Sequence, residues 1–193
     1  MTAALPRHPR RIAVIGCPGA GKSTLARALA ERLHLPLHHL DQLWWQPGWV
    51  VTTMDDFDQK LHAILDTDAW IIDGNNSRTL EARVSRADLV IHLDYPRRLC
   101  LWRALRRILA SYGRTRPDMA PGCPEHLDRE FLSYIWHFRR DVRPRLAAVL
   151  DDYPGRCVTC RSPRETERLL ARLAPWPSPS STLSSQPNPP LQP

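Results

Sequence analysis

Short apolar runs alternate with amphipathic segments over most of the chain, between residues 11 and 173. The apolar runs resemble buried parallel strands, several of them ending at a glycine or a carboxylate, and they cover residues 11–16, 35–40, 69–74, 87–94 and 156–160. The amphipathic segments carry apolar residues at helical spacing and cover residues 22–33, 54–67, 97–110, 127–152 and 162–173. This alternation predicts an α/β fold with a five-stranded parallel sheet flanked by helices on both faces.

Both ends of the chain lack this alternation. Residues 1–10 form a basic leader without the apolar stretch of a secretory signal. Residues 174–193 contain seven prolines and five serines, so they cannot bury enough apolar surface to offset their chain entropy. We therefore expect one folded domain over residues 11–173, followed by a disordered tail over residues 174–193.

The composition is typical of a soluble globular protein. Hydrophobic residues make up 42% of the chain, but no apolar run approaches the roughly 18 residues that cross a bilayer. The five cysteines are an odd number and scattered, which suits reduced thiols in the cytoplasm better than disulfides. The net charge is +7, and 25 of the 27 basic residues are arginine, the better partner for phosphate groups. We expect a cytoplasmic monomer with no membrane segment, and the charge leaves nucleotides and nucleic acids open as ligands.

The segment GCPGAGKST, residues 16–24, fits the P-loop pattern G-x-x-x-x-G-K-[ST]. It follows an expected strand and opens an expected helix, which is the context in which this pattern forms an ATP site. Lys22 would reach the β- and γ-phosphates, and the Ser23 hydroxyl would bind Mg²⁺. The alternative is a glycine-rich turn without a ligand. The expected ATP-binding residues are Gly16, Cys17, Pro18, Gly19, Ala20, Gly21, Lys22, Ser23 and Thr24.

A second motif, WIIDGNNSR, ends another expected strand at the carboxyl edge of the sheet, where open α/β proteins bind ligands. Asp73 at this edge is a candidate for holding Mg²⁺ through water, together with Ser23. Arg78 is a candidate for contacting a phosphate of the acceptor. The alternative is an ordinary turn in which the two asparagines only shape the backbone.

The expected helix at residues 97–110 carries two arginines, Arg103 and Arg107, four residues apart. Leu101, Leu105 and Ile108 share one face of this helix, and the arginines lie opposite. Like charges at this spacing repel, so an anion between them would be stabilising. The following segment, residues 111–126, has the composition of a lid that closes over phosphates. A solvated basic face and a solvated loop are the alternatives.

The P-loop together with the "DYP…R…R" helix resembles the adenylate-kinase-like nucleotide kinases. The resemblance implies that Arg103 and Arg107 bind phosphates at the hinge of the lid, and that residues 161–165 lie against adenine. In those kinases the acceptor arginine follows the Asp-Gly pair by three residues, whereas Arg78 follows Gly74 by four. The donor side of the site therefore carries over, and the acceptor side does not.

Longer motifs, among them HLDQLWWQPGW, RTRPDMAPGCPE and FRRDVRPR, resemble small bacterial P-loop proteins described as DNA topology modulation proteins. We expect a P-loop kinase that transfers the γ-phosphoryl group of ATP to a small-molecule acceptor, a nucleotide being one candidate. The alternative that the resemblance implies is a nucleic-acid-associated ATP-binding protein. No helix-turn-helix or aromatic-rich RNA motif supports that alternative.

The stretch HLDQLWWQPGW opens the expected acceptor-binding segment, residues 39–67. Its Asp41 follows the second expected strand, so we expect it to face the P-loop across a cleft, with Trp44 and Trp45 contributing to the acceptor pocket. Shikimate and gluconate kinases, which this chain resembles, carry a carboxylate here that holds a hydroxyl acceptor. The expected catalytic residues are Lys22, Asp41, Arg103 and Arg107. The alternative is a packed loop in which Asp41 caps a short helix.

Overall fold

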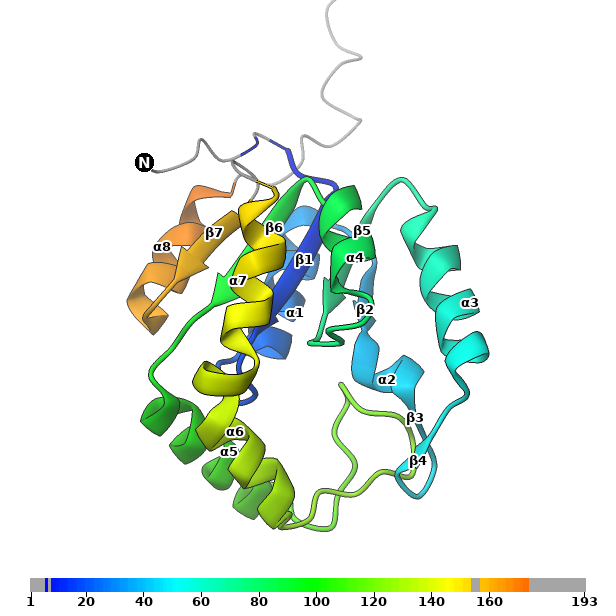
Figure 1. The fold of residues 1–193 in the computed structure, drawn as a ribbon, viewed down its shortest axis with the longest axis vertical. Coiled ribbons are helices and arrows are strands. Elements are labelled where there is room, and N and C mark those ends of the chain that lie inside the picture. The colour runs from blue at the N-terminus through cyan, green and yellow to red at the C-terminus, as the bar shows by residue number, and fades with distance from the viewer. Residues whose placement is uncertain (1–5, 7, 154–156, 174–193) are drawn as a thin grey trace, which may run out of the picture.

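The computed structural model describes residues 6, 8–153 and 157–173 (Figure 1). The tail expected at residues 174–193 lies outside the described residues, as does most of the leader. One sheet of five parallel strands forms the centre of the fold, in the order β2-β5-β1-β6-β7. Its strands are β1 (Arg11–Gly16), β2 (Leu37–His39), β5 (Trp70–Asp73), β6 (Leu89–Leu93) and β7 (Cys157–Cys160). The predicted five-stranded parallel sheet is confirmed.

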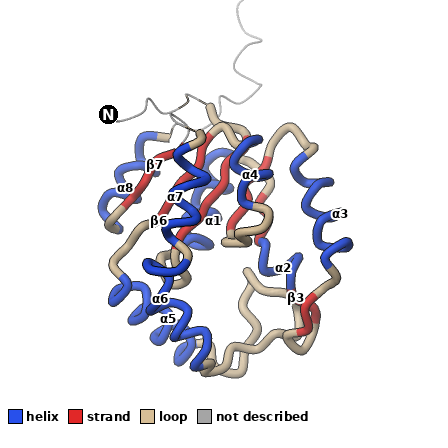
Figure 2. Tube along the Cα trace, viewed as in Figure 1, coloured by secondary structure: helices blue, strands red, loops and turns tan. Residues whose placement is uncertain are grey.

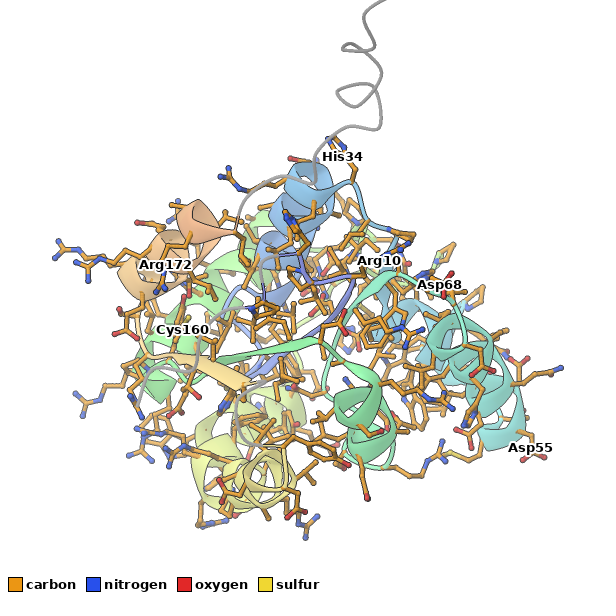
Figure 3. All side chains as sticks on the ribbon, turned by 90° about the horizontal axis from the view of Figure 1, so that it is seen from above. Arg10, His34, Asp55, Asp68, Cys160 and Arg172 are labelled. Atoms are coloured by element: carbon orange, nitrogen blue, oxygen red, sulfur yellow. The ribbon has the colours of Figure 1, made fainter. Side chains whose placement is uncertain are left out.

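The central strands are continuous apolar runs because both of their faces are covered. Every residue of β5 and β6 is buried, as expected for parallel strands between two layers of helices. The helices α1 (Lys22–Leu33) and α8 (Pro163–Arg172) lie on one face, and α4 (Leu80–Arg86) and α7 (Arg143–Asp151) lie on the other (Figures 1 and 3). The core therefore runs along both faces of β1, with Leu29 of α1 and Val84 of α4 fully buried.

Two helical regions differ from the sequence expectation. The segment expected as one helix over residues 127–152 forms α6 (Arg129–Asp141) and α7, with the break at Val142. Pro144 causes it, because proline lacks the N–H donor of a helix interior and is tolerated only in a first turn. The short helix α4 was not predicted, since seven residues carry too little periodic signal.

The acceptor-binding segment expected at residues 39–67 contains four elements. These are α2 (Leu40–Trp44), β3 (Trp45–Gln46), β4 (Val50–Val51) and α3 (Met54–Leu65). The strands β3 and β4 pair as an antiparallel hairpin, whose turn needs left-handed backbone at Gly48 (φ 79°) and Trp49 (φ 62°). Helix α5 (Arg97–Ala110) has the expected bounds, and the loop after it runs across to the hairpin (Figure 2).

The parallel register brings the chemistry-bearing residues to one edge of the sheet. His39 pairs with Asp73 in register, and Gly16 pairs with Leu93, so the strand ends β2, β5, β1 and β6 lie side by side. The P-loop, the turn after Asp73 and helix α5 all start from this edge. Within the described ranges, no helix is both long and apolar enough to span a membrane.

Candidate active site

A cavity of about 1420 Å³ opens at the carboxyl edge of the sheet. Its wall includes the P-loop, the acceptor-binding segment, the turn after β5, helix α5, the lid segment and the start of α8. Of the predicted site residues, only Gly16 and Cys17 are not on this wall. The sequence motifs, although spread over about 90 positions, therefore surround one space. That space exceeds the roughly 300–1,000 Å³ typical of a single small-ligand pocket, which suits two substrates.

The P-loop owes its shape to glycine at the positions where the backbone is left-handed. Gly19 and Gly21 have φ of 82° and 97°, and Gly21 precedes the first residue of α1, Lys22. A Cβ at Gly19 would collide with the backbone carbonyl of Cys100 in α5. The loop therefore packs directly on α5, and the Lys22 ammonium turns back over the loop, with Nζ 3.4 Å from the carbonyl oxygen of Cys17.

Asn75 fixes the start of the P-loop, a role that the sequence reasoning missed. Its Oδ1 accepts a hydrogen bond from the N–H of Gly16 at 2.9 Å, and its Nδ2 donates to the carbonyl of the same residue. The turn that carries Asn75 is itself held by Arg83, whose fully buried guanidinium donates to the carbonyls of Gly74 and Asn76. Burial lowers the pKa of Arg83 to about 10.

Asp73 lies at the end of β5, buried and facing the cavity. Its Oδ2 is 2.9 Å from Nδ1 of His39, and its Oδ1 has no hydrogen-bond partner within the described part of the chain. A buried carboxylate oxygen without a partner is costly, so a ligand on Oδ1 would be stabilising. His39 was not predicted as a site residue, although it opens the motif that contains Asp41.

Asp41 lies in the first turn of α2 and faces the cavity. The carboxyl is open to the water of the cleft but surrounded by protein at short range. This desolvation raises the pKa of Asp41, and the charge of Lys22 partly opposes the rise. Among the described residues Asp41 forms no salt bridge. It does not cap the helix through its side chain, since it lies inside α2 and His39 is the N-cap residue.

Arg103 and Arg107 lie half-buried on the cavity wall and not on a solvated face. The buried side of α5 consists of Cys100, Ala104 and Ile108, whereas Leu101 and Leu105 are only half-buried. The arginines thus flank the buried side and do not lie opposite to it. Burial and the neighbouring charge of Arg116 lower the pKa of Arg107, so its cationic form would gain from a nearby anion.

The lid segment, residues 111–126, brings two buried carboxylates into the cavity as well as an arginine. Arg116 is 2.5 Å from both Asp118 and Glu125, and Glu125 is also 3.6 Å from Arg107. Burial alone would raise the pKa of Asp118, but Arg116, its own backbone amide and the hydroxyl of Ser23 lower it. The sequence predicted a lid that closes over phosphates but gave no sign of these two acids.

The tryptophans of residues 39–49 divide into two groups. Trp44 packs edge-on against Phe57 of α3, with ring centroids 5.2 Å apart. Trp45 and Trp49 instead pack against Met119, Ala120 and Cys123 of the lid. We call this contact the hairpin–lid interface. It also contains hydrogen bonds from the Gly48 N–H to the Gly122 carbonyl at 2.8 Å and from Trp49 Nε1 to the Pro124 carbonyl at 3.0 Å.

Arg78 lines the cavity on the acceptor side, but its guanidinium already has a partner. Nη1 and Nη2 donate to the two carboxylate oxygens of Asp58 in α3, at 2.8 and 2.5 Å. The guanidinium also lies 5.9 Å from the centroid of the Phe57 ring. The predicted phosphate contact of Arg78 would require this ion pair to break.

Residues 12–109 match the sequence profile of the AAA domain family, and they make up a little more than half of the chain. The chain belongs to the AAA domain family. The AAA domain match runs from β1 to α5, so it includes the P-loop, Asp41, Asp73, Arg103 and Arg107, and it ends before the lid.

Two solved structures are similar to this AAA domain chain. A shikimate kinase from Bacteroides thetaiotaomicron is 18% identical with a TM-score of 0.52, covering 86% of this chain and 96% of its own. A gluconokinase from Sinorhizobium meliloti 1021 is 21% identical with a TM-score of 0.49, covering 88% and 95%. The likeness to the shikimate kinase shows that the fold is that of a P-loop kinase. No curated protein matches the sequence.

Proposed function

We propose that the protein transfers the γ-phosphoryl group of ATP to a hydroxyl group of a small molecule. One observation carries the proposal: Lys22 and Ser23 of the P-loop share a single cavity with Asp41 of the acceptor-binding segment and with Arg103 and Arg107. A donor loop, a free carboxylate and phosphate-facing cations are the parts that phosphoryl transfer needs, because its catalysis rests on positioning and charge stabilisation.

The donor half of the cavity suits Mg·ATP. The N–H groups of the loop would bind phosphate oxygens, and Lys22 would bridge the β- and γ-phosphates. Ser23 and the unpartnered Oδ1 of Asp73 are oxygen ligands on the same wall. They fit an ion that keeps several waters and takes its other ligands from phosphates. Mg²⁺ bound there would neutralise charge on the β- and γ-oxygens.

The acceptor half suits a nucleophilic hydroxyl. The hydroxyl oxygen would attack the γ-phosphorus, the bond to the β–γ bridging oxygen would break, and ADP would leave. Asp41 would accept the hydroxyl proton and release it to water. Its raised pKa supports this role, because a base whose pKa lies nearer to neutrality accepts a proton more readily. Arg103 and Arg107 would stabilise the charge that develops on the transferring group.

ADP release is the test of this function. Purified protein with Mg·ATP is offered polyols, sugars, nucleosides and amino alcohols in turn, and ADP is measured by a coupled assay. At least one class should raise ADP release well above the rate without acceptor. Absence of any stimulated ADP release, combined with absence of ATP binding, would refute the proposal.

A second candidate function rests on a separate basic cluster. A cavity of about 590 Å³ between α5, α6 and the start of α7 is lined by Arg97, Trp136, His137, Arg139, Arg140 and Arg143. This surface would suit the nucleic-acid role that the resemblance to DNA topology modulation proteins implies. Several of these arginines are already paired: Arg139 and Arg143 with Asp94, and Arg140 with Asp141. Duplex DNA binding that weakens steeply with salt, and is lost in Arg97→Ala, would favour this candidate.

A further inference from the structure

The distribution of charge around the cavity is uneven, and it bears on the acceptor. Lys22 and Arg103 are close to the phosphate-binding loop: Lys22 belongs to it, and Arg103 Nη1 would lie 3.9 Å from a Cβ at Gly21. Arg107 and Arg116 are joined to Glu125 beside them. On the acceptor side, where α3 and the turn after β5 form the wall, Arg78 is the cation among the described lining residues.

Asp58 neutralises that cation. The two side chains form a two-point contact across 20 positions of sequence, and fork-to-fork contacts of this kind are the strongest geometry for an arginine and a carboxylate. The hydrogen bond between them raises the pKa of Arg78 and lowers the pKa of Asp58. Each group therefore stabilises the charged form of the other, and the carboxylate of Asp58 compensates the positive charge of Arg78.

The remaining groups of the acceptor end are a carboxylate, the uncharged polar side chains of the turn after β5, and apolar side chains. Asp41 has no salt bridge within the described residues. Met54, Trp44 and Phe57 supply apolar wall. An acceptor with a phosphate or carboxylate would face the Asp41 carboxylate and a neutralised arginine, whereas an uncharged or amine-bearing alcohol would face hydrogen-bond acceptors and aromatic surface.

Resting on the proposed function, we infer that the acceptor is an alcohol without an anionic group, and that Asp58 enforces this selectivity by holding Arg78. Asp58 is a specificity-determining residue: it does not touch the reacting atoms, but it removes the charge that would otherwise attract phosphates and carboxylates. The pair is partly open to solvent, with side-chain exposures of 47% for Arg78 and 32% for Asp58. Replacing Asp58 therefore exposes the guanidinium without opening the core.

The experiment measures anion binding at the acceptor end while ADP and Mg²⁺ fill the donor end. Gluconate and AMP are the anionic probes, and sorbitol and adenosine are their uncharged counterparts; tryptophan fluorescence and calorimetry report binding. Asp58→Asn should bind the anionic probes about tenfold or more tightly than the wild type, since it frees one positive charge. The double variant Asp58→Asn, Arg78→Gln should not bind the anionic probes more tightly than the wild type. Asp55→Asn, an exposed residue of the same helix (Figure 3), is the matched control and should behave as the wild type.

Two outcomes would overturn the inference. One is a wild-type protein that binds gluconate or AMP more tightly than the uncharged counterpart and loses this binding in Arg78→Gln. The other is an Asp58→Asn variant that gains no anion affinity. Both leave the proposed transfer reaction intact, because ADP release with an uncharged alcohol is measured separately. Failure of ADP to bind would count against the transfer reaction and not against the role of Asp58.

Discussion

The carboxylate of Glu125 lies 3.6 Å from the guanidinium of Arg107, although one residue belongs to the lid and the other to helix α5. Glu125 also contacts Arg116 and is only 5% exposed. A buried acid between two arginines of the cavity wall holds both guanidinium groups in place. We therefore regard Glu125 as a positioning residue for the cations that would meet the phosphates.

We predict that Glu125→Gln lowers kcat by about tenfold to a hundredfold, because displaced arginines stabilise the negative charge of the transition state less well. KM for ATP should change less than kcat, which a steady-state series in ATP measures. Glu130→Gln, at an exposed position of α6, is the control and should leave both constants alone. If Glu125→Gln lowers kcat as much as Glu125→Ala does, and also lowers the melting temperature as much, the role of Glu125 is merely structural.

We predict that Lys22→Ala lowers ATP turnover by roughly 10³-fold or more, because the ammonium acts on the phosphate being transferred. The fold should remain, since Lys22 makes one long hydrogen bond to the loop. Circular dichroism and thermal melting check the fold, and ADP release checks the turnover. A folded variant with near-normal turnover would contradict the assignment of the P-loop.

We predict that Asp41→Asn reduces phosphoryl transfer by roughly 10²-fold or more, the low end for a lost general base. Because the pKa of Asp41 is raised above 3.8, the acid limb of the kcat profile should fall at a higher pH than for an ordinary aspartate. That limb should be absent from the residual activity of the variant. Full transfer activity in Asp41→Asn would show that the acceptor is activated elsewhere.

The same variant should be more stable than the wild type at neutral pH. A folded pKa above the unfolded value means that ionised Asp41 destabilises the fold; this penalty grows as pH rises from the unfolded pKa to the folded pKa and is complete above it. Below the unfolded pKa both chains are neutral at this position, so the difference in melting temperature should vanish there. A melting temperature at pH 7 below that of the wild type would contradict the raised pKa.

We predict that Trp49→Phe loosens the lid. The change removes the hydrogen bond from Nε1 to the Pro124 carbonyl, and one such bond contributes about 1 kcal/mol, or about a fivefold change in an opening equilibrium. Hydrogen exchange over residues 111–126 should accelerate by that factor. Trp102→Phe, an exposed indole on α5, provides the comparison and should leave this exchange unchanged. Unchanged exchange in Trp49→Phe would mean that the indole does not hold the lid.

The parts of the site that sequence could predict are those with a local signature. The P-loop combines a spacing of glycines with Lys22 and Ser23, and Arg103 and Arg107 follow each other at helical spacing after a strand end. Each pattern lies within a short segment that follows a strand, so its place in the sequence is enough to put it at the carboxyl edge of the sheet.

The parts that sequence missed depend on contacts between distant segments. Asn75 binds Gly16 across 59 positions, and Glu125 reaches Arg107 only because the lid folds back over α5. The sequence next to Arg78 gives no sign that Asp58, 20 positions earlier, forms an ion pair with it. Likewise, Trp45 was predicted to contribute to the acceptor pocket, and its packing on the lid could not be predicted, because that part of the lid lies about 70 positions later in the chain.

If the lid covers the donor half and the hairpin covers the acceptor half, the hairpin–lid interface joins the two covers. A substrate that favours closure at one end would then also favour closure at the other. By thermodynamic linkage the effect is reciprocal: if ATP raises the affinity for the acceptor by some factor, the acceptor raises the affinity for ATP by the same factor. Joined covers would also exclude water from the cavity, so little ATP would be hydrolysed in place of transfer to the acceptor.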